Sequence, residues 1–188
     1  MHKLVLVCGV MMLASSVATV AFGEGEKEKA PAATAAPVPP EVKKTVDAMT
    51  GSWAWDGTVT GMGKDPIKAK ETFVCKKAAG GRAVSCSGKG NIPGLGNVED
   101  EALVAYDVEG KSIRFVGFSS TGEIHDHKCM WKDDKTMTCD PLAVTVGGQP
   151  ASVALTVSFP DAKSMVMNET TTMKDGTKVA FDGKGKRR

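Results

Sequence analysis

Gly51-Ser52-Trp53-Ala54-Trp55-Asp56-Gly57 is the stretch that decides the fold of this 188-residue chain. Before it, residues 41–49 place apolar side chains at helical spacing, and after it apolar and polar residues alternate with a period of two. A short helix, a Gly-x-Trp and a long series of strands is the order in which a small closed up-and-down β-barrel begins. We therefore expect an all-β fold in which a short N-terminal capping helix packs on Trp53 at one end of the barrel. A barrel of this size holds one small ligand.

Alternation marks the strands that follow. In residues 152–159, Val153, Leu155, Val157 and Phe159 face one way and small or polar residues face the other. Turn residues recur at short intervals: Ala79-Gly80-Gly81, Glu109-Gly110, Thr121-Gly122, Lys132-Asp133-Asp134, Gly147-Gly148, Pro160-Asp161 and Asp175-Gly176. With no helix between them, these segments predict an antiparallel meander of about ten strands. We favour a closed barrel over a sandwich because closure leaves no unpaired edge.

Three further expectations concern the surface of this barrel. Residues 102–106 and 113–118 are apolar on both faces, which predicts strands that are covered more deeply than the others. Residues 91–97 form the one irregular loop and are expected to cover one end as a lid. The basic C-terminal residues, from Lys184 to Arg188, are expected to form a solvated tail.

The N-terminal region predicts export. Residues 1–23 have the pattern of a secretory signal peptide, with His2 and Lys3 before an apolar run and cleavage after Gly23. Residues 24–40 are first charged and then rich in Ala and Pro, which predicts a disordered tether. The barrel domain is expected over residues 41–188, which contain no second apolar run long enough to span a membrane. We therefore expect a periplasmic or extracellular protein.

Charge and cysteine content agree with a periplasmic or extracellular location. Cleavage removes one Lys and no acid, so the formal net charge falls from +2 to +1. Such a balance does not point to nucleic acid or an anionic membrane surface as a partner. Four cysteines remain, and an even number in an exported chain predicts disulfides, for which three pairings exist. We favour Cys75–Cys86 and Cys129–Cys139 because each pair flanks its own turn.

Several short stretches carry a resemblance to a known family: Gly51-Ser52-Trp53; Gly80-Gly81-Arg82; Val104-Ala105-Tyr106-Asp107 followed by Phe115-Val116-Gly117-Phe118; and Cys129-Met130-Trp131-Lys132-Asp133-Asp134-Lys135-Thr136-Met137-Thr138. Through them, residues 48–182 resemble a family of uncharacterised bacterial lipocalin-like domains within the calycin group. The resemblance implies a lipocalin-like barrel, and calycin relatives carry lipids, retinoids, bilins or haem. It transfers no site residue to this chain.

The expected function is binding of a small apolar or amphipathic molecule inside the barrel. The candidate pocket residues are large side chains on the expected strands: Trp53, Tyr106, Phe115, Met130, Met137, Leu155, Val157, Met165, Met167 and Phe181. Methionine is adaptable and suits a pocket that accepts varied apolar ligands, but it also fills cores. A structural or protein-interaction domain with a filled barrel is therefore an alternative.

A metal site is a second alternative. Glu123, His125 and His127 alternate and so share one face of a strand. Imidazole with carboxylate suits zinc or another transition metal, with Glu123 or another carboxylate as third ligand if the cysteines are oxidised. One axial histidine inside an apolar barrel also binds haem iron, but Glu123, Asp126 and Lys128 make this segment polar on both faces. Such a site implies redox or isomerase-type activity through His125 and His127. The competing interpretation is a polar strand face near solvent.

Nothing in the sequence points to nucleophilic catalysis. No serine lies in a Gly-x-Ser-x-Gly elbow, and Gly88-Lys89-Gly90 is too short for a phosphate-binding loop. Glu99-Asp100-Glu101 precedes an expected strand and is expected to be solvated. We therefore expect a binding protein rather than an enzyme, with no cofactor.

Overall fold

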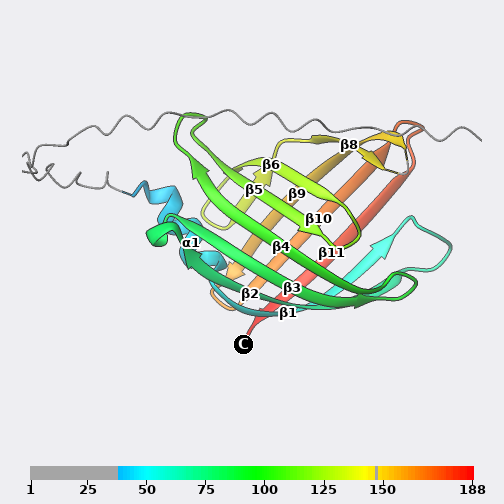
Figure 1. Cartoon of the computed structure of the whole chain (residues 1–188), viewed down its shortest axis with the longest axis horizontal. Coiled ribbons are helices and arrows are strands. Elements are labelled where there is room, and N and C mark those ends of the chain that lie inside the picture. Colours follow the sequence, from blue (N-terminus) through cyan, green and yellow to red (C-terminus); the bar gives the residue numbers. More distant parts are fainter. Residues whose placement is uncertain (1–37, 147) are drawn as a thin grey trace, which may run out of the picture. The chain divides into compact units, whose positions relative to one another are not determined.

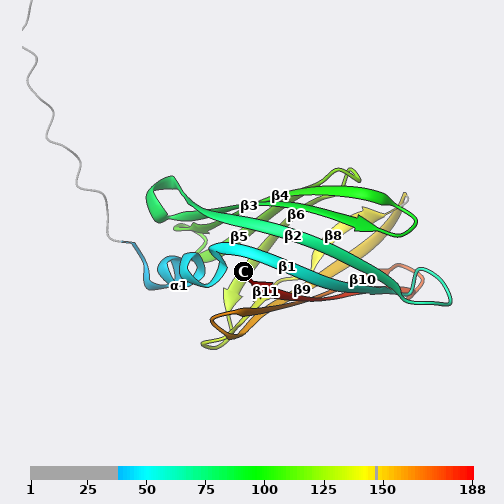
Figure 2. The same cartoon turned by 90° about the horizontal axis from the view of Figure 1, so that it is seen from below.

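A computed structural model describes residues 38–146 and 148–188 of the protein (Figures 1 and 2). The expected signal peptide at 1–23 and all but the last three residues of the expected tether at 24–40 lie outside the described residues. None of the described helical segments has the length and apolar character needed to cross a bilayer.

The described chain is mostly strand. One α-helix, α1 (Pro40–Met49), comes first, and a short 3-10 turn, Ala79–Gly81, joins two of the strands. The strands are β1 (Gly51–Thr60), β2 (Ile67–Ala78), β3 (Ala83–Ile92), β4 (Gly96–Asp107), β5 (Ser112–Ser119), β6 (Ile124–Trp131), β7 (Thr136–Cys139), β8 (Leu142–Val146), β9 (Gln149–Asp161), β10 (Ser164–Met173) and β11 (Lys178–Arg187).

Ten of these strands close into an antiparallel barrel. The order is β10-β11-β1-β2-β3-β4-β5-β6-β7-β9, and β9 pairs back with β10 to complete the ring. Among the described strands, the remaining strand β8 pairs only with β9. β7 and β8 pair with successive parts of the same edge of β9. This arrangement, with the helix before the first strand, confirms the fold expected from the sequence (Figure 1).

One part of the wall is split. β6 pairs with β7 through Cys129–Trp131, whereas in the described chain its first half forms a ladder with β5 alone. β8 runs beside β9 but forms no ladder with β6 in the part of the chain that the structure describes. The barrel wall is therefore interrupted between the start of β6 and β8.

The helix closes one end of the barrel (Figure 2). Its buried residues are Val42, Thr45, Val46 and Met49, which are spaced to lie on one face. Trp53 is 1% exposed, and its indole Nε1 donates to the Met49 carbonyl at 2.9 Å. Trp131 Nε1 of β6 donates to Thr45 Oγ1 of α1 at 3.0 Å. Segments of α1, β1 and β6, which are distant in sequence, therefore meet at this end of the barrel. The expected docking of the helix on Trp53 is confirmed.

The two disulfides also match the expected pairing. Cys75–Cys86 joins β2 to β3, and Cys129–Cys139 joins β6 to β7. In both cases the two cysteines are directly opposite each other in the strand register. Each bond therefore fastens one pair of neighbouring strands.

The alternation within each strand separates an inner from an outer face, and some inner positions are glycines. A Cβ at Gly88 would lie 2.4 Å from the Phe73 ring, and one at Gly185 would lie 2.8 Å from the Trp55 ring. Both distances are far below a normal contact, so these rings lie directly on the glycine backbone. Aromatic rings from β1 and β2 thereby fill the interior without widening the barrel.

Three sequence expectations about the surface are wrong. Leu103 and Phe118 are 45% and 50% exposed, because one face of every barrel strand points outward and no second layer of described residues covers β4 and β5. Residues 91–97 form no lid, because the β3–β4 ladder continues to the pair Ile92–Gly96 and leaves a short turn. The basic C-terminus is not a free tail, because β11 pairs with β1 up to Arg187, whose guanidinium lies over the Trp53 ring.

Candidate functional site at the open end of the barrel

The interior at the α1 end is filled. Buried apolar side chains and both disulfides form one core cluster there. The space left among them is about 40 Å³, enough for only a few water molecules. Its walls are Met49, Trp53, Trp55, Phe73, Cys75, Cys86, Ala102, Phe115, Val157, Met165 and Met167. This half of the barrel therefore has no room for a ligand unless side chains move.

Most of the apolar pocket candidates from the sequence belong to this filled half. Trp53, Met137, Leu155, Val157 and Met165 are buried in the core cluster, and Phe115 and Met167 are partly buried against it. Their positions suit packing, and binding by these residues stays a prediction.

The other three candidates are Phe181, Tyr106 and Met130, of which Tyr106 also packs against the core cluster. The Phe181 ring lies inside the barrel, on the backbone of Gly57 and Gly183. Tyr106 and Met130 line a depression of about 490 Å³ beside α1. Met130 is 52% exposed because it alternates with the buried Cys129 and points away from the barrel axis.

A hollow of similar volume lies at the other end of the barrel, beside the split between β6 and β8. Its volume is about 500 Å³. Apolar walls come from β8 and β9, including Leu142, Val144 and Val153, and polar walls come from the start of β6 and from β10. The polar side chains that line it are Thr121, Glu123, His125, Asp126, Thr145, Glu169 and Thr171. This end therefore combines an apolar and a charged wall around one space.

Acidic side chains lie on the inward face near this end. Glu71 is in phase with Ala69 and Phe73 on β2, and burial together with the charge of Asp100 raises its pKa to about 7. Burial also raises the pKa of Asp100 and of Glu169. Asp100 was expected to be solvated, and that expectation is wrong because it alternates with outward-facing Glu99 on β4.

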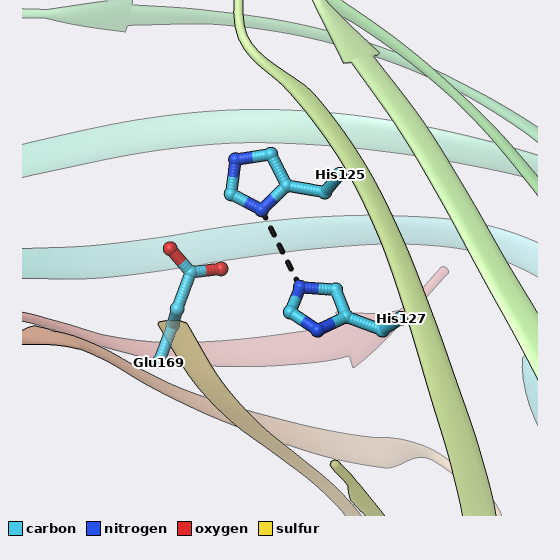
Figure 3. A group of neighbouring side chains, drawn as sticks. All are labelled: His125, His127 and Glu169. Atoms are coloured by element: carbon cyan, nitrogen blue, oxygen red, sulfur yellow. Dashed lines mark hydrogen bonds between the residues drawn. The ribbon is translucent and has the colours of Figure 1, made fainter. Parts of the chain in front are cut away.

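The two histidines also point inward (Figure 3). His127 is 1% exposed and His125 is half-buried, and His125 Nδ1 lies 3.4 Å from His127 Nε2. The competing interpretation, a polar strand face near solvent, is therefore wrong for His127. Asp126 faces outward, where it forms an ion pair with Arg114, while the histidine side of β6 faces the interior.

The two imidazoles differ in their electrostatics. The Glu123 carboxylate, whose Oε2 lies 3.7 Å from His125 Nε2, raises the pKa of His125, and the imidazole in turn lowers the pKa of Glu123. Burial lowers the pKa of His127, and the neighbouring His125 lowers it further. The pKa of the inner His127 therefore lies below that of the outer His125, so His125 takes up a proton first as the pH falls.

A carboxylate from a distant strand completes the group. Glu169 on β10 offers an oxygen that lies, with one nitrogen from each histidine, in a set of three atoms within 4.8 Å of one another. Figure 3 shows its carboxylate directed toward the two rings. Glu123, the carboxylate proposed from the sequence, precedes β6 and lies beside the outer histidine. Sequence reasoning missed Glu169, although its phase with Met167 and Thr171 on β10 indicates an inward position.

Comparison with known proteins places the fold in a class. The closed ten-strand barrel with its N-terminal helix fits the architecture of a lipocalin-like barrel. No protein-family model and no curated protein matches the sequence. The S-type phycobiliprotein lyase CPES from Guillardia theta is similar in structure, with a TM-score of 0.58 and 9% identity over 79% of this chain and 93% of that chain.

Two designed proteins also align. A de novo designed fluorescence-activating β-barrel has a TM-score of 0.45 and 14% identity over 77% of this chain and 98% of its own. The redesigned barrel mFAP0, solved with DFHBI, has a TM-score of 0.43 and 10% identity over 74% of this chain and 99% of its own. At these identities the likeness to the lyase establishes a shared barrel fold and nothing finer.

Proposed function

We propose that this protein is an exported carrier that binds one small amphipathic molecule in the hollow at the open end of the barrel. The observation that carries the proposal is the division of the interior into a filled apolar half and a hollow of about 500 Å³ with one apolar and one charged wall. A volume of several hundred Å³ with a few convergent polar groups is typical of small-molecule sites. The two disulfides support an oxidising, extracytoplasmic location.

The walls indicate the chemistry of the ligand. An aliphatic or aromatic part fits against Leu142, Val144 and Val153, and a polar end meets Glu123 and Glu169 on the facing side. Both polar groups are carboxyls, so a basic or uncharged hydrogen-bonding end suits the metal-free protein better than an acidic one. The lyase named above acts in bilin chemistry by its name, which supports a small-molecule role for barrels of this shape.

The first experiment is native mass spectrometry of the protein purified from its natural host. We expect one retained organic molecule per chain, which organic extraction removes. The visible absorption spectrum of the same sample tests the haem hypothesis for His125 and His127, because haem gives an intense Soret band.

A pair of variants then locates the site. Thr171 lines the hollow, whereas Thr170 precedes it on β10 and faces outward. Thr171→Trp fills the hollow, so the retained molecule should be lost, and Thr170→Trp should keep it. Retention by both variants contradicts the proposal. A protein with no bound molecule that also fails to bind amphipathic dyes supports the filled-barrel, structural alternative instead.

A further inference from the structure

We propose that His125, His127 and Glu169 bind one divalent transition-metal ion at the inner wall of the hollow. The inference goes beyond the proposed function, because it does not depend on which organic molecule the hollow accepts. It replaces the Glu123-His125-His127 set suggested by the sequence with a set drawn from two strands.

The separation of the ligand atoms suits such an ion. Bonds of about 2.0–2.1 Å from zinc to nitrogen or oxygen at tetrahedral angles place neighbouring ligand atoms about 3.3 Å apart. His125 Nδ1 and His127 Nε2 lie 3.4 Å apart, and one nitrogen of each ring and one Glu169 oxygen lie within 4.8 Å of one another. The pair of nitrogens is therefore already at the spacing of two zinc ligands. A small movement of the Glu169 side chain brings its oxygen to the same ion.

The three ligands come from different parts of the barrel wall. β6 carries both histidines, and β10 carries Glu169, with β7 and β9 between them in the strand order. Glu169 thus reaches the histidines across the interior and not along a shared ladder (Figure 3). Polar residues in a row on one strand do not by themselves bring in a carboxylate from a second strand. The convergence of Glu169 on the two histidines is therefore more than a polar strand face.

Glu123 has a different role in this arrangement. When His125 binds through Nδ1, its Nε2 carries the proton and faces Glu123 Oε2 at 3.7 Å. A carboxylate behind a ligating histidine fixes the tautomer and the orientation of the ring. His127 binds through Nε2, which leaves the proton on Nδ1, a buried atom with no hydrogen-bond partner among the described residues. Glu123 is therefore a positioning residue and not a ligand.

The donor set also selects the kind of metal. Two imidazole nitrogens and one carboxylate suit Zn²⁺, Cu²⁺, Ni²⁺ or Co²⁺, whereas Ca²⁺ and Mg²⁺ prefer six or more oxygen ligands. The four cysteines of the barrel are paired in disulfides and do not compete as ligands. Three protein ligands leave at least one coordination position, and the hollow beside His125 and Glu169 is open to supply it with water.

The test uses the whole protein without a histidine tag, stripped with a chelator and titrated with Zn²⁺ by calorimetry and with Co²⁺ by visible absorption. We expect one Zn²⁺ per chain with a dissociation constant of about 1 µM or lower. Co²⁺ should give the intense d–d bands of a four- or five-coordinate site. Because the described residues contain only these two histidines, ¹⁵N-histidine NMR should show both rings shifting on addition of Zn²⁺.

Variants separate the roles of the residues. His125→Gln and Glu169→Gln, at half-buried positions, should each weaken Zn²⁺ binding at least about 100-fold, and Glu123→Gln about 10- to 100-fold, as loss of an outer carboxylate does. Glu101→Gln is the matched control, since this exposed carboxylate lies on the outer face of β4, where it accepts a hydrogen bond from Ser87 Oγ, and it does not line the hollow; this variant should bind Zn²⁺ normally. Circular dichroism confirms that each variant is folded.

Two results overturn the inference. Absence of Zn²⁺ and Co²⁺ binding at metal concentrations about 100-fold above the expected dissociation constant means that the two histidines form only a hydrogen-bonded pair. Binding that survives both His125→Gln and Glu169→Gln means that the metal lies elsewhere. Neither result affects the organic ligand, whose loss is measured separately with Thr171→Trp, so failure of one proposal is distinguishable from failure of the other.

Discussion

Replacing Glu71 by Gln should make the protein more stable near neutral pH and should remove part of its pH dependence. Glu71 faces the barrel interior, where burial and Asp100 raise its pKa from the usual 4.5 to about 7. The folded protein therefore holds this proton at a pH where the unfolded chain has lost it. Stability from this group is fully present below pH 4.5 and is lost as the pH rises through 7.

The size of the effect follows from the two pKa values. A shift from 4.5 to about 7 corresponds to an upper limit of about 3 kcal/mol, at about 1.4 kcal/mol per pKa unit. The carboxyl is only half-buried, and solvent screening reduces the contribution to about 1–2 kcal/mol. The glutamine amide has nearly the shape of the protonated acid and does not ionise. We expect the variant to match the wild type at about pH 4.5 and to exceed it by about 1–2 kcal/mol at about pH 7.5.

Urea unfolding at a series of pH values between about 4.5 and 7.5, with the disulfides intact, measures this difference. Taking wild type minus variant at each pH removes the contributions of the other titrating groups to first order. Glu99→Gln is the control, because this carboxylate lies on the outer face of β4 in an ion pair with Lys89. It should give no gain in stability as the pH rises. Parallel stability curves for wild type and Glu71→Gln would falsify the interior placement of a protonated Glu71.

Three further outcomes test the fold. Trp53→Ala should lower the free energy of unfolding by about 3–5 kcal/mol in the same urea assay, because it removes a buried ring and the hydrogen bond to Met49; an unchanged melt refutes the capping role. Gly88→Ala should cost about 1–3 kcal/mol, because its Cβ would lie 2.4 Å from the Phe73 ring, whereas Gly63→Ala, with open space around it, should be neutral. Joint replacement of Cys129 and Cys139 by Ser should cost about 2–3 kcal/mol for a 10-residue separation, and equal stability of the double variant contradicts the cross-link.

The parts of the fold that the sequence predicted depend on local signals. Gly51-Ser52-Trp53 after a helical segment predicted the closed end, and the apolar alternation of residues 152–159 predicted β9. The disulfides were predictable because the two cysteines of each pair flank one turn, which brings them opposite each other in a hairpin. Each of these inferences needs only residues within about a dozen positions along the chain.

The parts that were missed depend on closure of the barrel. Glu169 meets His125 only because the strand order brings β10 round to face β6, and no local pattern states how far the register is staggered. The same limit applies to Asp100, which was grouped with Glu99 as a solvated pair. Its phase with Val98 and Ala102 was a local signal for an inward position, but the acidic run obscured it.

The distribution of charge inside the barrel argues against a purely structural role. Burial disfavours the ionised forms of Glu71, Asp100 and Glu169, and none of these inward positions requires a charged residue to form a strand. At the α1 end, by contrast, apolar side chains fill the interior of the barrel, and aromatic rings pack there against glycine backbone. A barrel that served only as packing gains stability when its inner acids become apolar. Glu169 lines the hollow, so this distribution of acids supports the binding site proposed there.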